Sequence, residues 1–240
     1  LAGVAGKFAA VGTSDGLLFF YSAASGRRLA PPIVLDSPPH SLEAQVLDNG
    51  KWFLLVITRS GLCSVYNVRE KKLVCARSAA PLLARPVDAV GGVPDSDDAA
   101  VRTDIYRNVA NARVTWTGEP ILTLSDSHVF AYSRDLAAWI EVAGGSAHNS
   151  EFARELAAPG GVGIVRSLQA SGASSHRVPS LSGMSGLRRA AIESLAHLET
   201  LLECSLALSS AVDYRYYLAT YASKLVSSQD DGVESAEKRI

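Results

Sequence analysis

Short apolar runs separated by turn residues fill the chain from Lys7 to about Val142, which is the pattern of strands joined by hairpins. Three stretches of this region align on a tyrosine, and each contains a strand, a polar turn and a second strand. The turns are Asp15-Gly16, Ser60-Gly61 and Asp126-Ser127, and the aligned tyrosines are Tyr21, Tyr66 and Tyr132. A third strand is predicted after each hairpin, around Leu29, Leu73 and Trp139.

The spacing of these units resembles that of propeller blades. Tyr21 and Tyr66 are 45 residues apart, and the longer second interval is explained by Val87 to Ala100, an acidic Gly- and Pro-containing segment that predicts an exposed loop. Three blades are too few to close a propeller, so we expect open strand edges. Missing sequence, a helical layer or a second chain must cover them.

The apolar period changes to that of a helix from about Ser185 onward. One predicted helix face carries six residues at spacings of three and four, namely Leu187, Ala191, Leu195, Leu198, Leu202 and Leu206. A second helix is predicted after Ser209-Ser210, with Asp213 as its cap. Its predicted apolar stripe consists of Tyr214, Tyr217, Leu218, Tyr221 and Leu225.

These patterns divide the chain into three predicted regions. Residues 1–145 form the blade-like β region, 146–186 form a Gly/Ser-rich connection, and 187–240 form a helical region packed on the β part. The connection contains a helix candidate, Glu151 to Leu156, and a strand candidate, Gly163 to Leu168. The predicted fold is therefore α+β, with blade-like antiparallel sheets of WD-repeat-like hairpins followed by a C-terminal helical pair. Because the sequence begins without Met and stops in a charge-rich helical segment, we expect it to be part of a longer protein.

Composition excludes several broad classes. The 240 residues are 48% hydrophobic and 20% charged, which argues against intrinsic disorder, and no apolar run has the length of a membrane span. The formal net charge of −1 leaves no bulk electrostatic attraction for DNA or anionic lipid. Three widely spaced cysteines, Cys63, Cys75 and Cys204, indicate buried thiols in a reducing compartment.

No catalytic, cofactor-binding or metal-binding constellation emerges from the motifs. Gly12 to Gly16 matches the letters of a nucleophile elbow around Ser14, but a strand-like run follows it, so we place it in a hairpin. A serine hydrolase is kept as an unfavoured alternative that requires a strand–turn–helix there. The glycines of Gly160 to Gly163 precede a predicted strand and lack the lysine of a phosphate loop. The five histidines show no metal-ligand spacing and are expected on exposed surfaces.

An interaction surface is the remaining hypothesis, because Tyr and Trp are enriched at interface hot spots. The candidate docking residues are Trp139, Tyr216 and Tyr217. A fragment of a peptide-binding propeller, without oligomer formation, is a second alternative.

Several segments resemble one known family in the order in which they occur. The most specific is Gly26-Arg-Arg-Leu-Ala-Pro-Pro-Ile-Val-Leu-Asp-Ser-Pro38, and Leu62-Cys-Ser-Val-Tyr-Asn-Val68 and Gly118-Glu-Pro-Ile-Leu-Thr-Leu-Ser-Asp126 follow it. Arg134 to Val142 and Ser209 to Ala222 complete the set. Together they resemble the C-terminal domain of the HIRA/HIR histone chaperone subunits, including the fungal type, from about Gly12 to Val226.

The resemblance implies a non-enzymatic oligomerisation and docking domain in the nucleus. Its implied partners are further copies of itself in a trimer, or a paralogous HIR subunit, and the large helical-repeat subunit of the complex. Histones are reached indirectly, with no membrane and no strong direct DNA binding by this domain. The implied roles are replication-independent nucleosome assembly and transcriptional repression. The family's Trp-Asp pair corresponds to Tyr66-Asn67 here, which predicts an oligomer interface at Ser64, Tyr66, Asn67 and Val68.

Overall fold

The computed structural model describes residues 1–84, 107–144, 150, 152, 163–172 and 184–237, and it describes all their side chains except those of 171–172, 184–191 and 228–237. By packing, the chain divides into two compact units, Leu1–Asp126 and Ser127–Ile240. The predicted loop at Val87 to Ala100 lies outside the described residues, as does the helix predicted over Glu151 to Leu156, apart from Phe152.

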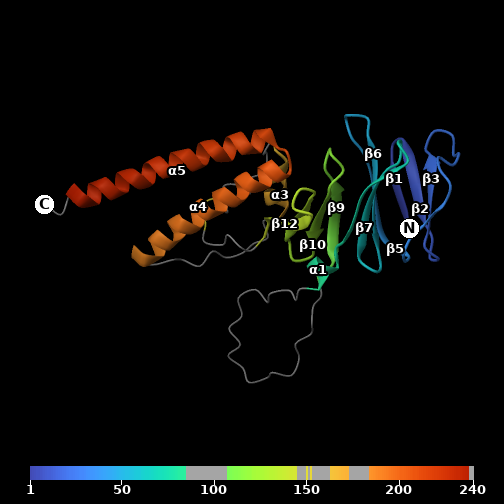
Figure 1. Cartoon of the computed structure of the whole chain (residues 1–240), viewed down its shortest axis with the longest axis horizontal. Coiled ribbons are helices and arrows are strands. Elements are labelled where there is room, and N and C mark those ends of the chain that lie inside the picture. Colours follow the sequence, from blue (N-terminus) through green and yellow to red (C-terminus); the bar gives the residue numbers. More distant parts are fainter. Residues whose placement is uncertain (85–106, 145–149, 151, 153–162, 173–183, 238–240) are drawn as a thin grey trace, which may run out of the picture. The chain divides into compact units, whose positions relative to one another are not determined.

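Twelve strands in the described residues form three four-stranded antiparallel sheets (Figure 1). The first sheet contains β1 (Ala2–Ala5), β2 (Phe8–Gly12), β3 (Leu17–Ser22) and β4 (Ile33–Val34). The second contains β5 (Pro39–Val46), β6 (Trp52–Thr58), β7 (Leu62–Asn67) and β8 (Lys72–Ser78). The third has the order β12-β11-β10-β9, from β9 (Val109–Val114), β10 (Pro120–Leu124), β11 (Val129–Ser133) and β12 (Ala138–Ala143).

The three predicted hairpins are the central strand pairs of these sheets, β2–β3, β6–β7 and β10–β11, and the aligned tyrosines lie on β3, β7 and β11. Each sheet also has a strand before its hairpin, which the alignment did not predict. The prediction of a third strand around Leu29 is wrong in its position. Tyr21 and Arg28 form only an isolated bridge, and β4 begins at Ile33. The prolines Pro31 and Pro32 explain the delay, because they have no N–H for strand pairing.

The backbone is left-handed at one residue of each hairpin turn, and in two of the three turns that residue is glycine. Gly16 and Gly61 have φ of 83° and 85°, which glycine adopts without a steric penalty. The third turn has Ser127 at the same place, with φ of 67°. A residue with a Cβ atom is disfavoured there by about 1–2 kcal/mol.

We therefore expect Ser127→Gly to stabilise the protein by about 0.5–1 kcal/mol, since relief of the strain exceeds the extra entropy of glycine in the unfolded chain. Urea unfolding of the wild type and the variant measures this difference. Ser125→Gly is the control: its hydroxyl accepts a hydrogen bond from the Asn108 N–H at 3.1 Å, so this change should destabilise. A loss of stability in Ser127→Gly would contradict the prediction.

The core of the first unit joins the first two sheets. Its buried members include Phe8, Leu18, Phe20, Leu54 and Val56. Trp52 stacks on Phe8 at 6.1 Å between ring centroids, so an aromatic contact links β6 to β2. The short helix α1 (Ala80–Leu83) follows β8 and buries Leu82.

Three helices in the second unit pack with β11 and β12. They are α3 (Ile164–Gly172), α4 (Met184–Ala207) and α5 (Ala211–Glu237), and α4 and α5 lie side by side (Figure 1). α3 contacts β11, β12 and both longer helices, and α4 contacts β12. The predicted α+β fold, with blade-like sheets and a C-terminal helical pair, is confirmed.

The strand predicted from Gly163 to Leu168 is wrong, because these residues begin α3. Gly163 consequently precedes a helix and not a strand. Buried Val165 and Leu168 are three residues apart, a spacing that a helix places on one face. The apolar residues Ile164, Val165 and Leu168 in so short a segment are also typical of a strand, but contacts from α5 decide for the helix.

The predicted apolar face of α4 is rotated from the observed one. The buried side carries Ser194, Leu198, Leu201, Cys204 and Ser205, whereas Leu206 is 55% exposed. The predicted stripe of α5 is also only partly correct, because Tyr217 is fully buried but Leu218 is 45% exposed. Both corrections arise because polar side chains occupy buried helix positions in this unit.

Candidate functional site

The four predicted oligomer-interface residues lie on and just after β7, a strand paired on both sides, with β6 and β8. Ser64, Asn67 and Val68 are buried within the chain itself. The Asn67 side-chain oxygen accepts the Glu70 N–H at 3.2 Å and closes the β7–β8 turn, and the Val68 N–H donates to the Trp52 carbonyl at 2.8 Å. These three residues therefore hold the blade together.

Tyr66 is the half-buried member of this set. Its ring meets Phe20 edge-on at 6.2 Å and packs against the core of the first unit. Burial raises the pKa of the Tyr66 hydroxyl, so it stays protonated at neutral pH. Of the four residues, Tyr66 is the one with exposed area for a second chain.

The three predicted docking residues have different environments. Trp139 on β12 is half-buried and meets Tyr132 edge-on at 5.5 Å. Tyr216 on α5 is 41% exposed, whereas Tyr217 is fully buried. Burial, followed by the charge of Asp213, raises the pKa of Tyr217. The interpretation of Tyr217 as a docking residue is corrected: its ring belongs to the core of this unit.

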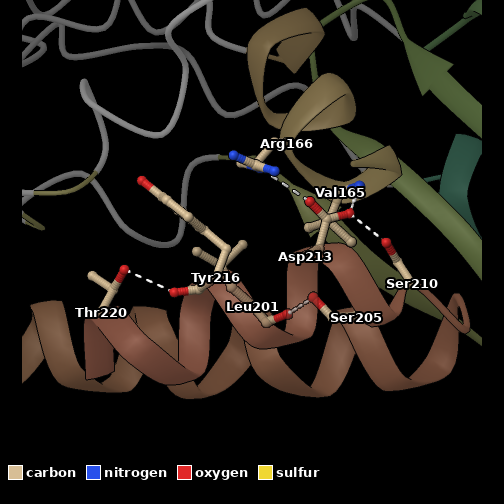
Figure 2. A network of polar contacts seen from close by, with 8 residues as sticks. All are labelled: Val165, Arg166, Leu201, Ser205, Ser210, Asp213, Tyr216 and Thr220. Carbon is tan, nitrogen blue, oxygen red and sulfur yellow. Dashed lines mark hydrogen bonds and ion pairs between the residues drawn. The ribbon is translucent and has the colours of Figure 1, made fainter. Parts of the chain in front are cut away.

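A polar network around Asp213 joins α3 to α5 (Figure 2). The carboxylate is fully buried and accepts the Val165 N–H at 2.8 Å, the Arg166 Nε–H at 3.2 Å and the Ser210 hydroxyl at 2.7 Å. The Arg166 guanidinium lies 4.4 Å from the centroid of the Tyr216 ring. A buried charge is tolerated when it is paired and hydrogen-bonded in this way.

The prediction of Asp213 as the cap of α5 is wrong, because α5 begins at Ala211 and Asp213 lies inside the helix. It lies in the first turn of α5 and satisfies the N–H of Val165 in the first turn of α3, where four N–H groups lack partners within the helix. A negative charge is also favoured there by the helix dipole. A Cβ atom on Gly163 would lie 1.7 Å from the Asp213 Oδ1, so glycine is required at that position.

This network could not be predicted from the sequence, because its members are far apart along the chain. Asp213 lies 48 residues after Val165. Two features of the sequence belong to the network: Gly163 before an apolar segment, and the acidic residue Asp213 in an apolar helix. Neither feature indicates that Gly163 and Asp213 are neighbours in the fold. The network also positions Tyr216 at the start of α5, because the Arg166 guanidinium packs over one face of its ring.

The segments that carry the family resemblance have structural roles in the blades. Arg28 of the Gly26–Pro38 segment places its guanidinium 5.0 Å from the centroid of the Phe19 ring. In the Gly118–Asp126 segment, Gly118 has φ of 98°, and a Cβ atom there would lie 2.6 Å from Val74. Asp126 forms a nearly buried ion pair with Arg107.

The other candidate residues remain without a catalytic arrangement. Ser14 and Asp15 are exposed in the β2–β3 hairpin, which excludes the strand–turn–helix that a nucleophile elbow requires. No disulfide joins the three cysteines, and burial raises the pKa of the Cys63 thiol to about 12 and that of Cys204 to about 11. Among the described residues, no group of three His, Cys, Asp or Glu side chains is arranged to hold a metal ion. None of the described helices is both long and apolar enough to span a membrane.

Two histidines depart from the expected surface positions. His128 pairs with Glu141 at 2.9 Å, and His197 on α4 is largely buried with its Nδ1 2.9 Å from the Ser150 hydroxyl. Burial lowers the pKa of His197 to about 4. His40 is exposed as expected, and His148 and His176 lie outside the described residues.

A family model, individual relatives and a solved structure all relate this chain to HIRA and HIR proteins. The family model Hira, described as TUP1-like enhancer of split, matches residues 26–232. HIRA of Oryza sativa subsp. japonica is 31% identical over 226 residues, which are 94% of this chain and 21% of that protein. HIR2 of Debaryomyces hansenii is 32% identical over 132 residues, 55% of this chain and 12% of that protein. The chain thus spans about a fifth of the length of its plant relative.

The crystal structure of HIRA(644-1017) shares the fold, with a TM-score of 0.61 and 24% identity over 98% of this chain and 65% of that one. The sheets and the helical layer thus define a blade-type β domain with a C-terminal helical pair. The chain belongs to the Hira family, as the resemblance of its segments predicted.

Proposed function

We propose that this chain is the oligomerisation and docking domain of a histone chaperone subunit in the nucleus, where its complex assembles nucleosomes independently of replication and represses transcription. The observation that supports this most is the family match over residues 26–232. The described residues also include exposed apolar side chains, which suit an assembly role.

Self-association as a trimer is the first part of the proposal, with a paralogous subunit as the alternative companion. Each four-stranded sheet has outer strands, such as β8 in the second sheet, and the edges of sheets favour pairing with a second chain. The net charge of −1 leaves little long-range repulsion between copies. The second part is recruitment of the large helical-repeat subunit, through which the domain reaches histones.

Tyr66 is the proposed contact between copies, because it is the one member of the predicted interface that is only half-buried. We expect the purified chain to have three times the mass of a monomer in light scattering, and Tyr66→Ala to be monomeric. The variant should keep a cooperative melt and lose about 1–3 kcal/mol, since only half of the ring is buried.

Tyr21→Ala is the matched control, because Tyr21 is the aligned, half-buried tyrosine of the first blade. It should lose similar stability and remain trimeric. A trimeric Tyr66→Ala protein would place the contact elsewhere, and a monomeric wild type at micromolar concentration would reject self-association.

A further inference from the structure

Helix α5 exposes an apolar side, and its inward side carries three tyrosines together with polar and charged residues. The residues described as buried or half-buried in its first seventeen positions are Asp213, Tyr214, Tyr217, Thr220, Tyr221 and Lys224. The α5 apolar face consists of Val212, Tyr216, Leu218, Ala222, Leu225 and Val226. All six are exposed, and the five larger side chains are 39% to 62% exposed. A surface helix normally carries charged and polar residues on its exposed side.

Even the hydroxyl groups of this helix add little polarity to the exposed side. The Ser223 hydroxyl donates to the Ala219 carbonyl at 2.9 Å, and the Thr220 hydroxyl donates to the Tyr216 carbonyl at 2.9 Å. Helix α4 is a useful contrast, because its exposed described residues include the carboxylates Glu199 and Glu203. A contiguous exposed apolar surface of this kind marks an interaction site.

The exposed residues form two adjacent rows along α5, against which a second helix can pack. Val212, Tyr216, Ala219, Ser223 and Val226 follow one another at spacings of four, three, four and three. The same spacings relate Ala211, Arg215, Leu218, Ala222 and Leu225 in the adjacent row. This is the repeat of a coiled-coil seam, in which side chains of one helix fill holes in its partner. Ala219, Ala222 and Ser223 are small, so a second helix can approach closely at the middle of the face.

The charge of the exposed residues distinguishes two candidate occupants, a second copy of α5 and a helix of another protein. The exposed described residues of α5 include one cation, Arg215, and no carboxylate, and Arg166 lies against Tyr216 at the start of the face. A second copy of α5 would bring another Arg215 and no exposed carboxylate from these residues. A helix with carboxylates beside its apolar stripe complements both the apolar residues and the positive charge of the face.

We propose that the α5 apolar face binds an amphipathic helix of a partner subunit, whose apolar stripe is flanked by acidic residues. This inference rests on the proposed docking function and assigns it a surface, with the partner helix laid along α5. Tyr216, held by the Asp213–Arg166 network, is the aromatic anchor at the N-terminal end of the face. Leu218, Leu225 and Val226 supply the apolar contacts.

The test compares two double variants in the full-length subunit. Leu218→Glu with Leu225→Glu places carboxylates on the α5 apolar face. Ile192→Glu with Leu206→Glu makes the same change at two α4 side chains that are 61% and 55% exposed. Binding of the purified large helical-repeat subunit is measured by calorimetry, with light scattering and thermal unfolding of each variant in parallel.

We expect the α5 variant to bind at least about 30-fold more weakly and the α4 variant to bind within about threefold of the wild type. Both should melt close to the wild type and keep its mass, since all four side chains are exposed. Arg215→Glu should weaken binding about fivefold, with a smaller salt dependence than the wild type.

Equal binding by the wild type and the α5 variant would overturn the assignment of the face and leave the docking function standing. A fall in the mass of the α5 variant would also overturn it, by showing that a second copy covers the face. A wild type that does not bind the helical-repeat subunit would reject the proposed docking function, and this inference with it.

Discussion

Asp213→Ala should cost about 3 kcal/mol of the free energy of unfolding. The change leaves the Val165 N–H and the Ser210 hydroxyl without their acceptor and removes the ion-pair partner of Arg166. Removing one partner of a buried, hydrogen-bonded pair typically costs about 3–5 kcal/mol. The lower end is expected here, because the Arg166 side chain is 18% exposed and can reach water.

Urea unfolding measures the total effect, and hydrogen exchange of the α3 amides localises it. Asp213→Asn is the graded variant, because its side-chain oxygen can still accept one hydrogen bond while the charge is lost, and it should cost less than alanine. Asp135→Ala, in the exposed β11–β12 turn, should be close to neutral. If Asp213→Ala were as stable as Asp135→Ala, the network would not hold α3.

Acidification should destabilise the protein through His197. Burial lowers its pKa from 6.5 to about 4, so between these values the unfolded chain binds a proton that the folded chain does not. Stability is therefore lost as the pH falls through this window. One pKa unit corresponds to about 1.4 kcal/mol, so the loss is about 2 kcal/mol by pH 5 and about 3 kcal/mol below pH 4.

The measurement is the difference in unfolding free energy between the wild type and His197→Asn from pH 7.5 to 4. Asparagine can keep a hydrogen bond to the Ser150 hydroxyl, which lies 2.9 Å from the histidine Nδ1, but it does not titrate. The carboxylates contribute to the pH dependence of both proteins and cancel in the comparison. Parallel curves for the two proteins would show that His197 titrates normally.

The hairpins, the two long helices and the family were predictable from the sequence, because their signals are local. Asp15-Gly16 and Ser60-Gly61 permit tight turns through φ near 85° at glycine, whatever the rest of the chain does. The helical spacing after Ser185 likewise lies within one element, and the Gly26–Pro38 segment carries the resemblance in consecutive residues. The oligomer contact at Tyr66 and the docking role of Trp139 and Tyr216 remain predictions.

The tertiary structure alone decided the features that depend on distant residues. Gly163 to Leu168 has the local composition of a strand, but the Asp213 carboxylate, 48 residues beyond Val165, satisfies the first turn of a helix there. The same kind of contact decided which helix faces are buried. Asp213 is inside because Arg166 and Ser210 compensate its charge, and Leu218 is outside because no described element covers it. Hydrophobic periodicity identifies a helix, but the groups that come to lie against it determine which side faces the core.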